Sequence, residues 1–294
     1  MLQGQRDREA FPVAASLERP QQRRDSRSVG MRRHTAPDFS AHRPSGCPSL
    51  HRKIDEHARQ VRIAAAIQLL DQDRLADAHL AFSEWYGNPA LTPEDETELI
   101  GLLDRLAGTV IYSRQHLLER PHEVQPGETL EHIASLYEVP WELLANINGI
   151  RDPKHLRTGE QLKVVRGPFN ALVELDKFRL TLFVQGRYAG RFKIGVGKDK
   201  VTPEGEFTVW QKIPNPTYYG TPVIDQDDPN NPLGEYMLDL GDKLMIHGTN
   251  DPQSIGRAES KGCIRLDNRD IKDVYEILSV KTENSAGSIV TIRR

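Results

Sequence analysis

The feature that most constrains this chain is a histidine and a cysteine that each stand beside glycine and are separated by a short loop. The two segments are His247-Gly248-Thr249 and Ser260-Lys261-Gly262-Cys263. A thiolate is the reactive form of cysteine, and a neighbouring imidazole can take up the thiol proton. The glycines let the backbone turn tightly and bring amide N–H groups close to a substrate carbonyl. The pattern therefore predicts a fold that holds both segments side by side, with Cys263 as nucleophile and His247 as base.

Around these residues the chain resembles a known family of enzymes. Residues 246–270, IHGTNDPQSIGRAESKGCIRLDNRD, are similar to the active-site segment of the YkuD-type L,D-transpeptidases, which cross-link peptidoglycan through a cysteine. Residues 202–207, TPEGEF, match the second signature of that family. The resemblance implies that the carbonyl group of Gly248 orients the histidine ring, so that no acidic third member is needed. It also implies that the backbone N–H groups of Gly262 and Cys263 hold the oxyanion.

The same resemblance suggests several substrate contacts, and each has a structural alternative. A guanidinium group can form two parallel hydrogen bonds with a carboxylate, so Arg265 is expected to bind a carboxylate of the substrate. The alternative is that Arg265 forms an ion pair with Asp239 or Asp267. Ser260 either shapes the loop or helps to hold the acyl group. Residues 214–236 are predicted to form a long loop over the substrate groove. The other candidate substrate contacts are Tyr218, Tyr219, Tyr236 and Asn250. Their structural alternative is that they only pack the loops against the domain.

A second module is recognisable in residues 120–167. It contains VQPGETL, then ASLYEV, then NING, then LRTGEQLKV, in that order. This order resembles the LysM module, which implies a βααβ fold and a ligand made of N-acetylglucosamine polymers, here the glycan strands of peptidoglycan. Thr129 is the expected cap of the first helix, and Pro140-Trp141 begins the second.

The resemblance also places the glycan in a groove between the first turn of this module and the turn before its last strand. The alternative is that the residues of these turns serve only as turn and core residues. The residues expected on one side of the groove are Pro126, Gly127, Glu128, Thr129 and Leu130, and those on the other side are Ile150 and Arg151.

Residues 54–119 are predicted to be helical. Thr92-Pro93 is a strong helix start, with a capping residue followed by proline at the first helical position. The apolar face that follows consists of Leu99, Leu102, Leu103 and Leu106. These helices would form either a tetratricopeptide-like hairpin that binds a protein partner or a single helical spacer. No second repeat supports an array, so the spacer is favoured.

Composition and charge exclude several classes of function. Residues 1–53 contain 11 Lys and Arg against 5 Asp and Glu, and their Arg, Pro and Ser content predicts a disordered basic tail. The whole chain has a net charge of −3, which argues against a general nucleic-acid binder. No spacing of Cys and His suggests a metal site, and no cofactor is expected. The two cysteines, Cys47 and Cys263, are expected to stay unpaired, because a disulfide would consume the nucleophile.

The location of the protein is expected from its function alone. No stretch approaches the roughly 20 apolar residues of a membrane span. No secretory signal is recognisable, since the early apolar run is short and contains Pro12. Peptidoglycan cross-linking nevertheless takes place outside the cytoplasmic membrane, so the cell envelope is the expected location.

Together these features predict an α+β, multidomain chain. The expected parts are the disordered tail (1–53), the helical region (54–119), the LysM module (120–167) and a mainly-β catalytic domain (168–294). The expected activity is acyl transfer from a tetrapeptide stem, with loss of D-Ala, through a thioester to an acceptor amine. The same site would serve an L,D-carboxypeptidase or a protein-anchoring transferase. A non-catalytic peptidoglycan-binding protein is the alternative of a different class.

Overall fold

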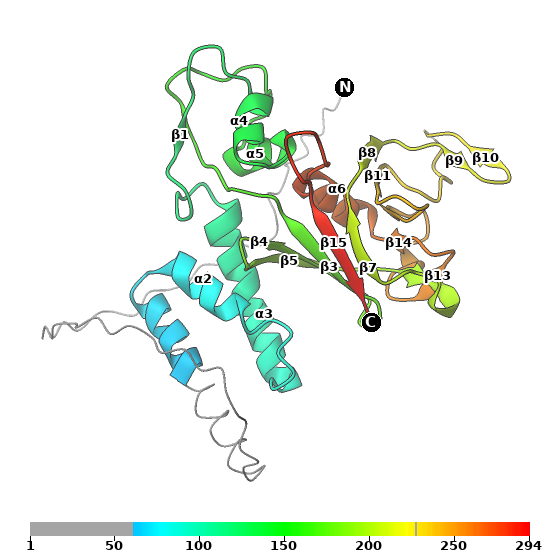
Figure 1. Cartoon of the computed structure of the whole chain (residues 1–294), viewed down its shortest axis with the longest axis horizontal. Coiled ribbons are helices and arrows are strands. Elements are labelled where there is room, and N and C mark those ends of the chain that lie inside the picture. The colour runs from blue at the N-terminus through cyan, green and yellow to red at the C-terminus, as the bar shows by residue number, and fades with distance from the viewer. Residues whose placement is uncertain (1–60, 227) are drawn as a thin grey trace, which may run out of the picture.

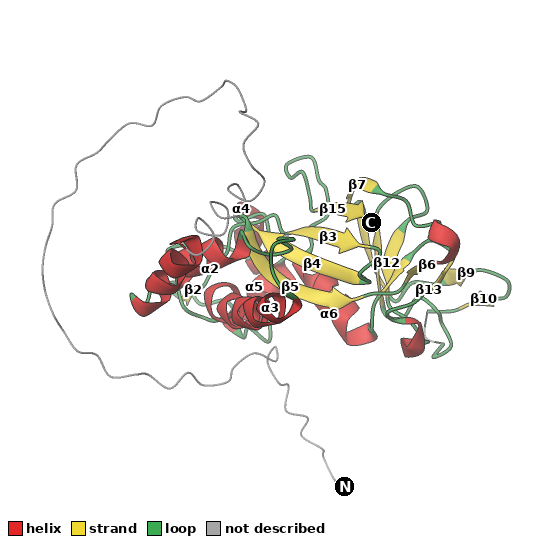
Figure 2. Cartoon of the chain, turned by 90° about the horizontal axis from the view of Figure 1, so that it is seen from below, coloured by secondary structure: helices red, strands yellow, loops and turns green. Residues whose placement is uncertain are grey.

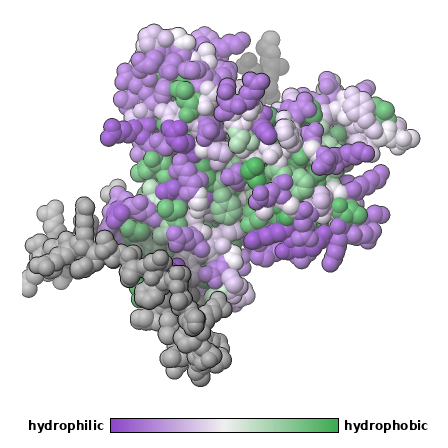
Figure 3. Space-filling model, in the orientation of Figure 1, coloured by the Kyte–Doolittle hydropathy of each residue, from purple (hydrophilic) through white to green (hydrophobic). Residues whose placement is uncertain are grey.

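The computed structural model of this chain describes residues 61–226 and 228–294. The predicted tail and Cys47 lie outside the described residues. The described part comprises N-terminal helices, a βααβ module and a larger strand-rich unit, which pack together around one continuous apolar core (Figure 1). This is the α+β architecture that the sequence predicts. Figure 3 shows a predominantly hydrophilic surface over the βααβ module. None of the described helices has the length and apolar content to cross a membrane.

The largest sheet has five strands in the order β5-β4-β3-β15-β7. The strands are β3 (Asn170–Glu174), β4 (Arg179–Val184), β5 (Arg187–Lys193), β7 (Gly205–Thr208) and β15 (Ile289–Arg293). The alternation of apolar and polar residues over 179–184, followed by Gln185-Gly186-Arg187, predicts a hairpin, and strands β4 and β5 form it. Its turn residues, Gln185 and Gly186, both have positive φ, as a two-residue turn of this kind requires. The C-terminal strand β15 lies parallel to β3 and antiparallel to β7, so it joins the two parts of the sheet.

A second sheet, in the order β14-β12-β11-β8, carries the histidine and cysteine segments. The strands are β8 (Gln211–Pro214), β11 (Tyr236–Asp239), β12 (Met245–His247) and β14 (Ile264–Arg265). Two short pairs flank it, and these are β6 (Val196–Gly197) with β13 (Ala258–Ser260), and β9 (Tyr218–Tyr219) with β10 (Val223–Ile224). Short 3-10 turns follow β6 and precede β13, at Lys198–Lys200 and Pro252–Ser254.

Helix α6 (Asn268–Ile277) packs on β11, where the Tyr236 and Tyr275 rings lie 4.9 Å apart. The residue types of this segment favour Asn268 or Asp270 as the cap of a helix over residues 271–278, but neither residue caps it. The cap is Asp267, whose carboxylate accepts the backbone N–H of Arg269 at 3.0 Å. The helix therefore starts earlier than its apolar periodicity indicates, and Asn268 is left to make a different contact.

The βααβ module has the element order that the sequence predicts. Strands β1 (His122–Glu123) and β2 (Gln161–Leu162) pair antiparallel, and α4 (Leu130–Leu136) and α5 (Trp141–Asn148) lie between them in the chain. Thr129 caps α4 by accepting the N–H of His132 at 3.2 Å, as expected. Gly149 ends α5 in the left-handed conformation, with φ of 65°, which glycine adopts without steric cost.

The N-terminal helices pack against the strand-rich unit. They comprise residues 61–71, α2 (Leu75–Ser83), α3 (Pro93–Ala107) and a π-helical turn η1 (Gly108–Tyr112). The predicted cap of α3 is confirmed, since Thr92 and Asp95 form a reciprocal capping box. Helices α2 and α3 lie against β5 (Figure 2), and the Tyr188 hydroxyl donates to Asp104 at 2.6 Å. Leu103 belongs to the apolar face of α3, which the tetratricopeptide-like alternative would use to bind a protein partner. It is completely buried within the chain, so it contributes to the internal core.

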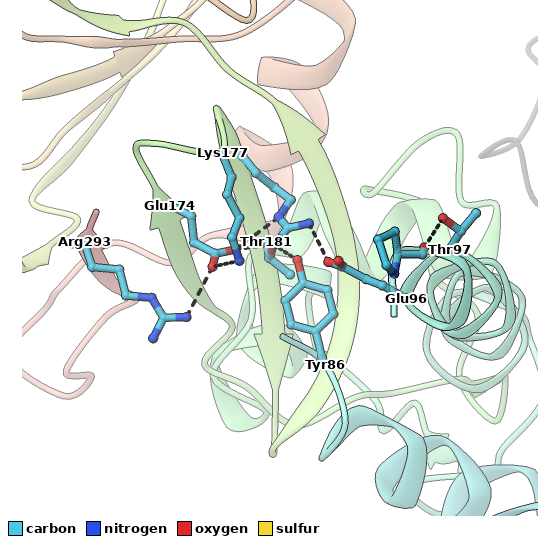
Figure 4. A network of polar contacts seen from close by, with 9 residues as sticks. Tyr86, Glu96, Thr97, Glu174, Lys177, Thr181 and Arg293 are labelled. Atoms are coloured by element: carbon cyan, nitrogen blue, oxygen red, sulfur yellow. Dashed lines mark hydrogen bonds and ion pairs between the residues drawn. The ribbon is translucent and has the colours of Figure 1, made fainter. Parts of the chain in front are cut away.

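A buried carboxylate holds the junction between helices and sheet (Figure 4). Glu174 of β3 pairs with Arg179 at 2.8 Å, with Lys177 at 3.0 Å and with Arg293 at 3.3 Å. Arg179 also reaches Glu96 of α3 at 3.3 Å. Burial alone would raise the pKa of Glu174, but hydrogen bonds from Arg179 and Lys177 outweigh it, and the pKa is lowered. The carboxylate therefore stays ionised and ties three strands to α3.

The βααβ module is joined to both other units by side chains rather than only by its linkers. The Lys163 ammonium, beside β2, is almost completely buried and donates to the carbonyl oxygens of Val110, at 2.9 Å, and of Gln115. These carbonyls follow the end of α3, where no helical donor is available. On the opposite side, Asn146 of α5 donates to Glu276 of α6 at 2.6 Å. The module is thus docked on the remainder of the described chain.

Candidate active site

His247 is held in one orientation by the backbone that follows it. The residue ends β12, and only 4% of its surface is exposed. Its Nδ1 lies 2.6 Å from the carbonyl oxygen of Gly248. A carbonyl oxygen can only accept, so Nδ1 carries the proton and Nε2 keeps a free lone pair. Burial lowers the pKa of His247 to about 4, and the Gly248 hydrogen bond opposes this shift only partly. The ring is therefore a neutral base at pH 7, in the arrangement that the resemblance implies.

Cys263 lies just before the strand that neighbours the histidine strand. It directly precedes β14, which runs parallel to β12 with His247 opposite Arg265. Burial raises the pKa of the Cys263 thiol, and a backbone hydrogen bond from Met245 and the charge of Arg265 oppose that rise. No hydrogen bond joins Cys263 to His247 in the described residues. The sequence predicts that the imidazole favours the thiolate, but in this resting conformation both groups are neutral because both are desolvated.

Ser260 and Thr202 brace the cysteine loop from two sides. The Ser260 hydroxyl donates to the Cys263 carbonyl at 2.6 Å and accepts the Gly262 N–H at 3.1 Å. Thr202 donates its hydroxyl to the Gly262 carbonyl at 2.9 Å and accepts the N–H of Gly197 at 2.8 Å. Ser260 thus shapes the loop, which is one of its two predicted roles. The N–H of Gly262 points at Ser260 here, so its predicted part in an oxyanion hole requires an exchange of partners.

Thr202 is a residue that the sequence analysis left without a role. It is the first residue of the signature at 202–207, and its side chain is buried beside the loop. Asn268 also had no predicted role in the site itself, and its side-chain oxygen accepts the backbone N–H of Thr249 at 2.9 Å. Both positions lie within the segments that carry the family resemblance. Their position within these motifs was thus the one signal by which the sequence could have pointed to them. The hydrogen bonds that they form depend on the tertiary fold.

Arg265 lies close enough to influence the pKa values of both His247 and Cys263. Its charge lowers the pKa of His247 and also that of Cys263. In the described residues it forms no ion pair, so the alternative pairing with Asp239 or Asp267 is not observed. Its backbone pairs with Gly195, but the buried Nε atom has no hydrogen-bond partner.

A pocket of about 530 Å³ lies against the 214–236 loop, and neither His247 nor Cys263 is among the residues that line it. Met237, which is opposite His247 in the sheet, and Met245, whose backbone contacts Cys263, form part of its wall. Tyr218 and Tyr219 line the pocket from the 214–236 loop, which is partly strand rather than irregular, and 85% of the Tyr219 surface is exposed. The predicted loop therefore borders a pocket that reaches Met237 and Met245, the neighbours of His247 and Cys263 in the sheet.

The other two predicted contacts of this region have structural partners. Tyr236 packs on Tyr275 of α6, as its structural alternative predicts. The Asn250 side chain donates to the carbonyl oxygen of Asn230 at 2.7 Å and so connects two loops. Asn250 is therefore a support for the loop in this conformation.

The predicted glycan residues of the βααβ module are distributed unevenly. A pocket of about 260 Å³ is lined by Ile150 and Arg151, together with the turn at 157–160. On the other side, Glu128 accepts hydrogen bonds from the Gln125 backbone at 2.8 Å and from His122 at 2.9 Å. Pro126 and Gly127 are exposed in this turn, and Thr129 is the helix cap.

Leu130 requires a correction. It is completely buried in the core of the module, so its side chain does not line a groove. Its position directly after the helix cap points it inward, because the first turn of α4 packs on the module interior.

Comparison with known proteins identifies two families within this chain. Residues 169–292 match the L,D-transpeptidase catalytic domain family, YkuD, and residues 122–165 match the LysM domain family. YkuD of Bacillus licheniformis is 33% identical over 165 residues, which cover 53% of this chain and 92% of that protein. YkuD of Bacillus subtilis is 34% identical over 182 residues, which cover 59% of this chain and 98% of that protein. An L,D-transpeptidase structure from Mycobacterium smegmatis aligns with a TM-score of 0.35 and 23% identity over 46% of this chain and 64% of that chain.

The two Bacillus proteins are covered over most of their length, and the catalytic-domain match contains both His247 and Cys263. The region before the LysM match, which includes the N-terminal helices, lies outside both family matches. The chain belongs to the YkuD-type family of L,D-transpeptidases, an acyltransferase kind of enzyme.

Proposed function

We propose that this protein is a peptidoglycan L,D-transpeptidase that uses Cys263 as its nucleophile. The observation that carries the proposal is the tautomer of His247, whose Nε2 lone pair is left free by the 2.6 Å contact of Nδ1 with Gly248. A neutral, oriented base on the strand beside a free thiol is the arrangement that general-base activation needs.

The donor half-reaction forms a thioester. The Cys263 sulfur attacks the carbonyl carbon of the third, L-centred residue of a tetrapeptide stem, while its proton moves to His247 Nε2. The backbone N–H groups of Gly262 and Cys263 hold the oxyanion, and Gly262 exchanges its bond to Ser260 for one to the substrate. The peptide bond to the terminal D-Ala breaks, and the leaving amine takes the proton from His247. Arg265 holds a stem carboxylate.

The acceptor half-reaction restores the thiol. An amine of a neighbouring stem attacks the thioester carbonyl, and His247 takes the proton that this amine loses. Collapse of the intermediate breaks the carbon–sulfur bond, and the proton returns to the sulfur. Tyr218 and Tyr219 border the pocket in which a stem would lie, next to Met245.

The LysM module would bind glycan through the pocket at Ile150 and Arg151 and the exposed turn at Pro126 and Gly127. Because the module is docked on α6 and on η1, glycan bound there would lie at a set distance from Cys263. A peptidoglycan enzyme of this kind would act in the cell envelope.

Mass spectrometry of the intact protein with a disaccharide-tetrapeptide muropeptide tests the proposal, with Cys263→Ala as control. The expected result is a Cys263 thioester with loss of D-Ala, followed by a cross-linked dimer. An adduct that yields only tripeptide would indicate a carboxypeptidase. An adduct transferred only to a protein amine would indicate an anchoring transferase. No adduct in the wild type, with sacculus binding intact, would indicate a non-catalytic binding protein.

A further inference from the structure

One peptide group links His247 to α6. The Gly248–Thr249 peptide accepts the His247 Nδ1–H at its carbonyl oxygen, at 2.6 Å, and donates its N–H to the side-chain oxygen of Asn268, at 2.9 Å. The carbonyl and N–H of a trans peptide point in opposite directions within one plane. The two hydrogen bonds therefore fix the orientation of this peptide plane, one at its carbonyl oxygen and the other at its N–H.

The surroundings of the Asn268 oxygen are built for this contact. A Cβ atom added to either Gly234 or Gly248 would collide with that oxygen. The backbones of these two glycines also approach each other closely, since a Cβ at Gly234 would lie 2.9 Å from the Gly248 Cα. Asn268 can occupy this place because Asp267, and not Asn268, caps α6. The Asn268 side chain must present its oxygen to Thr249, because the Thr249 N–H is a donor and the NH₂ group of an asparagine cannot accept a hydrogen bond.

We propose that Asn268 is a positioning residue for the reaction, which sets the orientation and tautomer of His247 through the Gly248–Thr249 peptide. This inference rests on the proposed function of His247 as the base. A bond donated by Thr249 to Asn268 polarises the peptide, and a polarised carbonyl is a stronger acceptor for Nδ1–H. The proton is thereby kept on Nδ1, and Nε2 stays free to receive the Cys263 proton. Asn268 itself does not touch the reacting atoms.

The test compares three variants of Asn268 with a matched control. Asn268→Leu removes the acceptor at similar size, Asn268→Ala removes it without any risk of a clash, and Asn268→Asp keeps an oxygen in place. The control is Asn170→Leu, since the Asn170 oxygen also accepts a backbone N–H, from Ile289 at 2.8 Å, in the other sheet. Thermal unfolding of the full chain establishes which variants are folded.

The first readout is imidazole ¹⁵N NMR of histidine-labelled full chain at pH 7, with the His247 signal assigned by its loss in His247→Gln. The wild type, Asn268→Asp and Asn170→Leu are expected to show the proton on Nδ1. Asn268→Leu and Asn268→Ala are expected to show partial transfer of the proton to Nε2.

The second readout is D-Ala release from the muropeptide. Loss of the acceptor is expected to lower kcat on the order of 10-fold with little change in KM, as removal of an orienting partner does elsewhere, and Asn268→Asp is expected to restore most of it. An unchanged tautomer and an unchanged kcat in a folded Asn268→Ala variant would overturn the inference, as would an equal loss in Asn170→Leu. If the wild type releases no D-Ala, the proposed function fails, while the NMR result still decides the role of Asn268.

Discussion

The Ser260 hydroxyl donates a hydrogen bond to the carbonyl oxygen of Cys263 over 2.6 Å. The same hydroxyl oxygen accepts the N–H of Gly262 at 3.1 Å, so one buried side chain holds the peptide groups before Gly262 and after Cys263, on either side of this residue pair. The position of the sulfur relative to the His247 strand thus depends on a residue three positions away in the chain.

Replacement of Ser260 by alanine is expected to slow acylation. The loop would lose two hydrogen bonds, and misplacement of a reacting atom by about 1 Å costs up to about 100-fold in rate. The free energy of unfolding is expected to fall by about 1 kcal/mol. D-Ala release and thermal unfolding measure both effects. Ser285→Ala is the control, because Ser285 accepts the N–H of Gly287 in an equivalent local turn away from the site. Equal rates in wild type and Ser260→Ala would contradict the assignment.

In the pH profile of kcat/KM, the loss of activity on the acidic side should occur at an unusually low pH. Burial lowers the pKa of His247 to about 4, so the free enzyme keeps a neutral base well below the ordinary histidine range near 6.5. As the pH falls, kcat/KM for D-Ala release is expected to stay level through pH 6 and to be halved only near pH 4. Since kcat/KM reports groups of the free enzyme, this profile tests the resting geometry. A half-point near 6.5 would show that His247 is not desolvated in solution.

The Cys263 thiol should be protonated at neutral pH. Burial raises its pKa above the ordinary thiol value, so the resting pair is thiol and imidazole rather than thiolate and imidazolium. Alkylation of Cys263 by iodoacetamide is expected to be slow at pH 7. It is expected to accelerate only when the pH rises above the pKa of an ordinary free thiol. Cys263→Ala corrects for reaction at Cys47. Rapid, pH-independent alkylation between pH 5 and 8 would instead indicate a preformed ion pair.

Lys163→Met is expected to lower the free energy of unfolding by about 1–3 kcal/mol, because the carbonyl groups of Val110 and Gln115 would lose their buried donor. Methionine keeps most of the aliphatic packing, so the loss reports the hydrogen bonds. Lys154→Met, at an exposed position of the same module, is the control. Urea unfolding of both variants measures the difference. Equal stability of the two would mean that Lys163 does not hold the module in place.

Asp273→Asn is expected to stabilise the protein at pH 7. Burial, together with Glu276 and Asp270, raises the pKa of Asp273 from 3.8 to about 6. The folded state therefore binds more protons than the unfolded state between those values, and ionisation above pH 6 costs folding free energy. The gain at pH 7 should be on the order of 1 kcal/mol and should disappear near pH 4. Asp176→Asn, at an exposed position, should show neither effect. A pH-independent gain would assign the change to packing instead.

The local structure of the chain was largely predictable because its signals act over a few residues. The cap at Thr92, the cap at Thr129 and the hairpin turn at 185–186 follow from side chains that bond to neighbouring backbone groups or from glycine conformation. The start of α6 is not predictable in this way, because Asp267 and Asn268 are both good capping residues and only the tertiary contact of Asn268 with Thr249 separates their roles.

The sequence by itself identified the family and its two modules and singled out His247 and Cys263 as the proposed reacting pair, because a motif specifies which side-chain types occur at which spacing. Tertiary structure alone decided the environment of that pair. The desolvation of His247 and Cys263, the braces at Thr202 and Asn268 and the docking of the LysM module through Lys163 join residues distant in the chain. Burial and hydrogen-bond geometry depend on these long-range contacts, and no local pattern of residues specifies them.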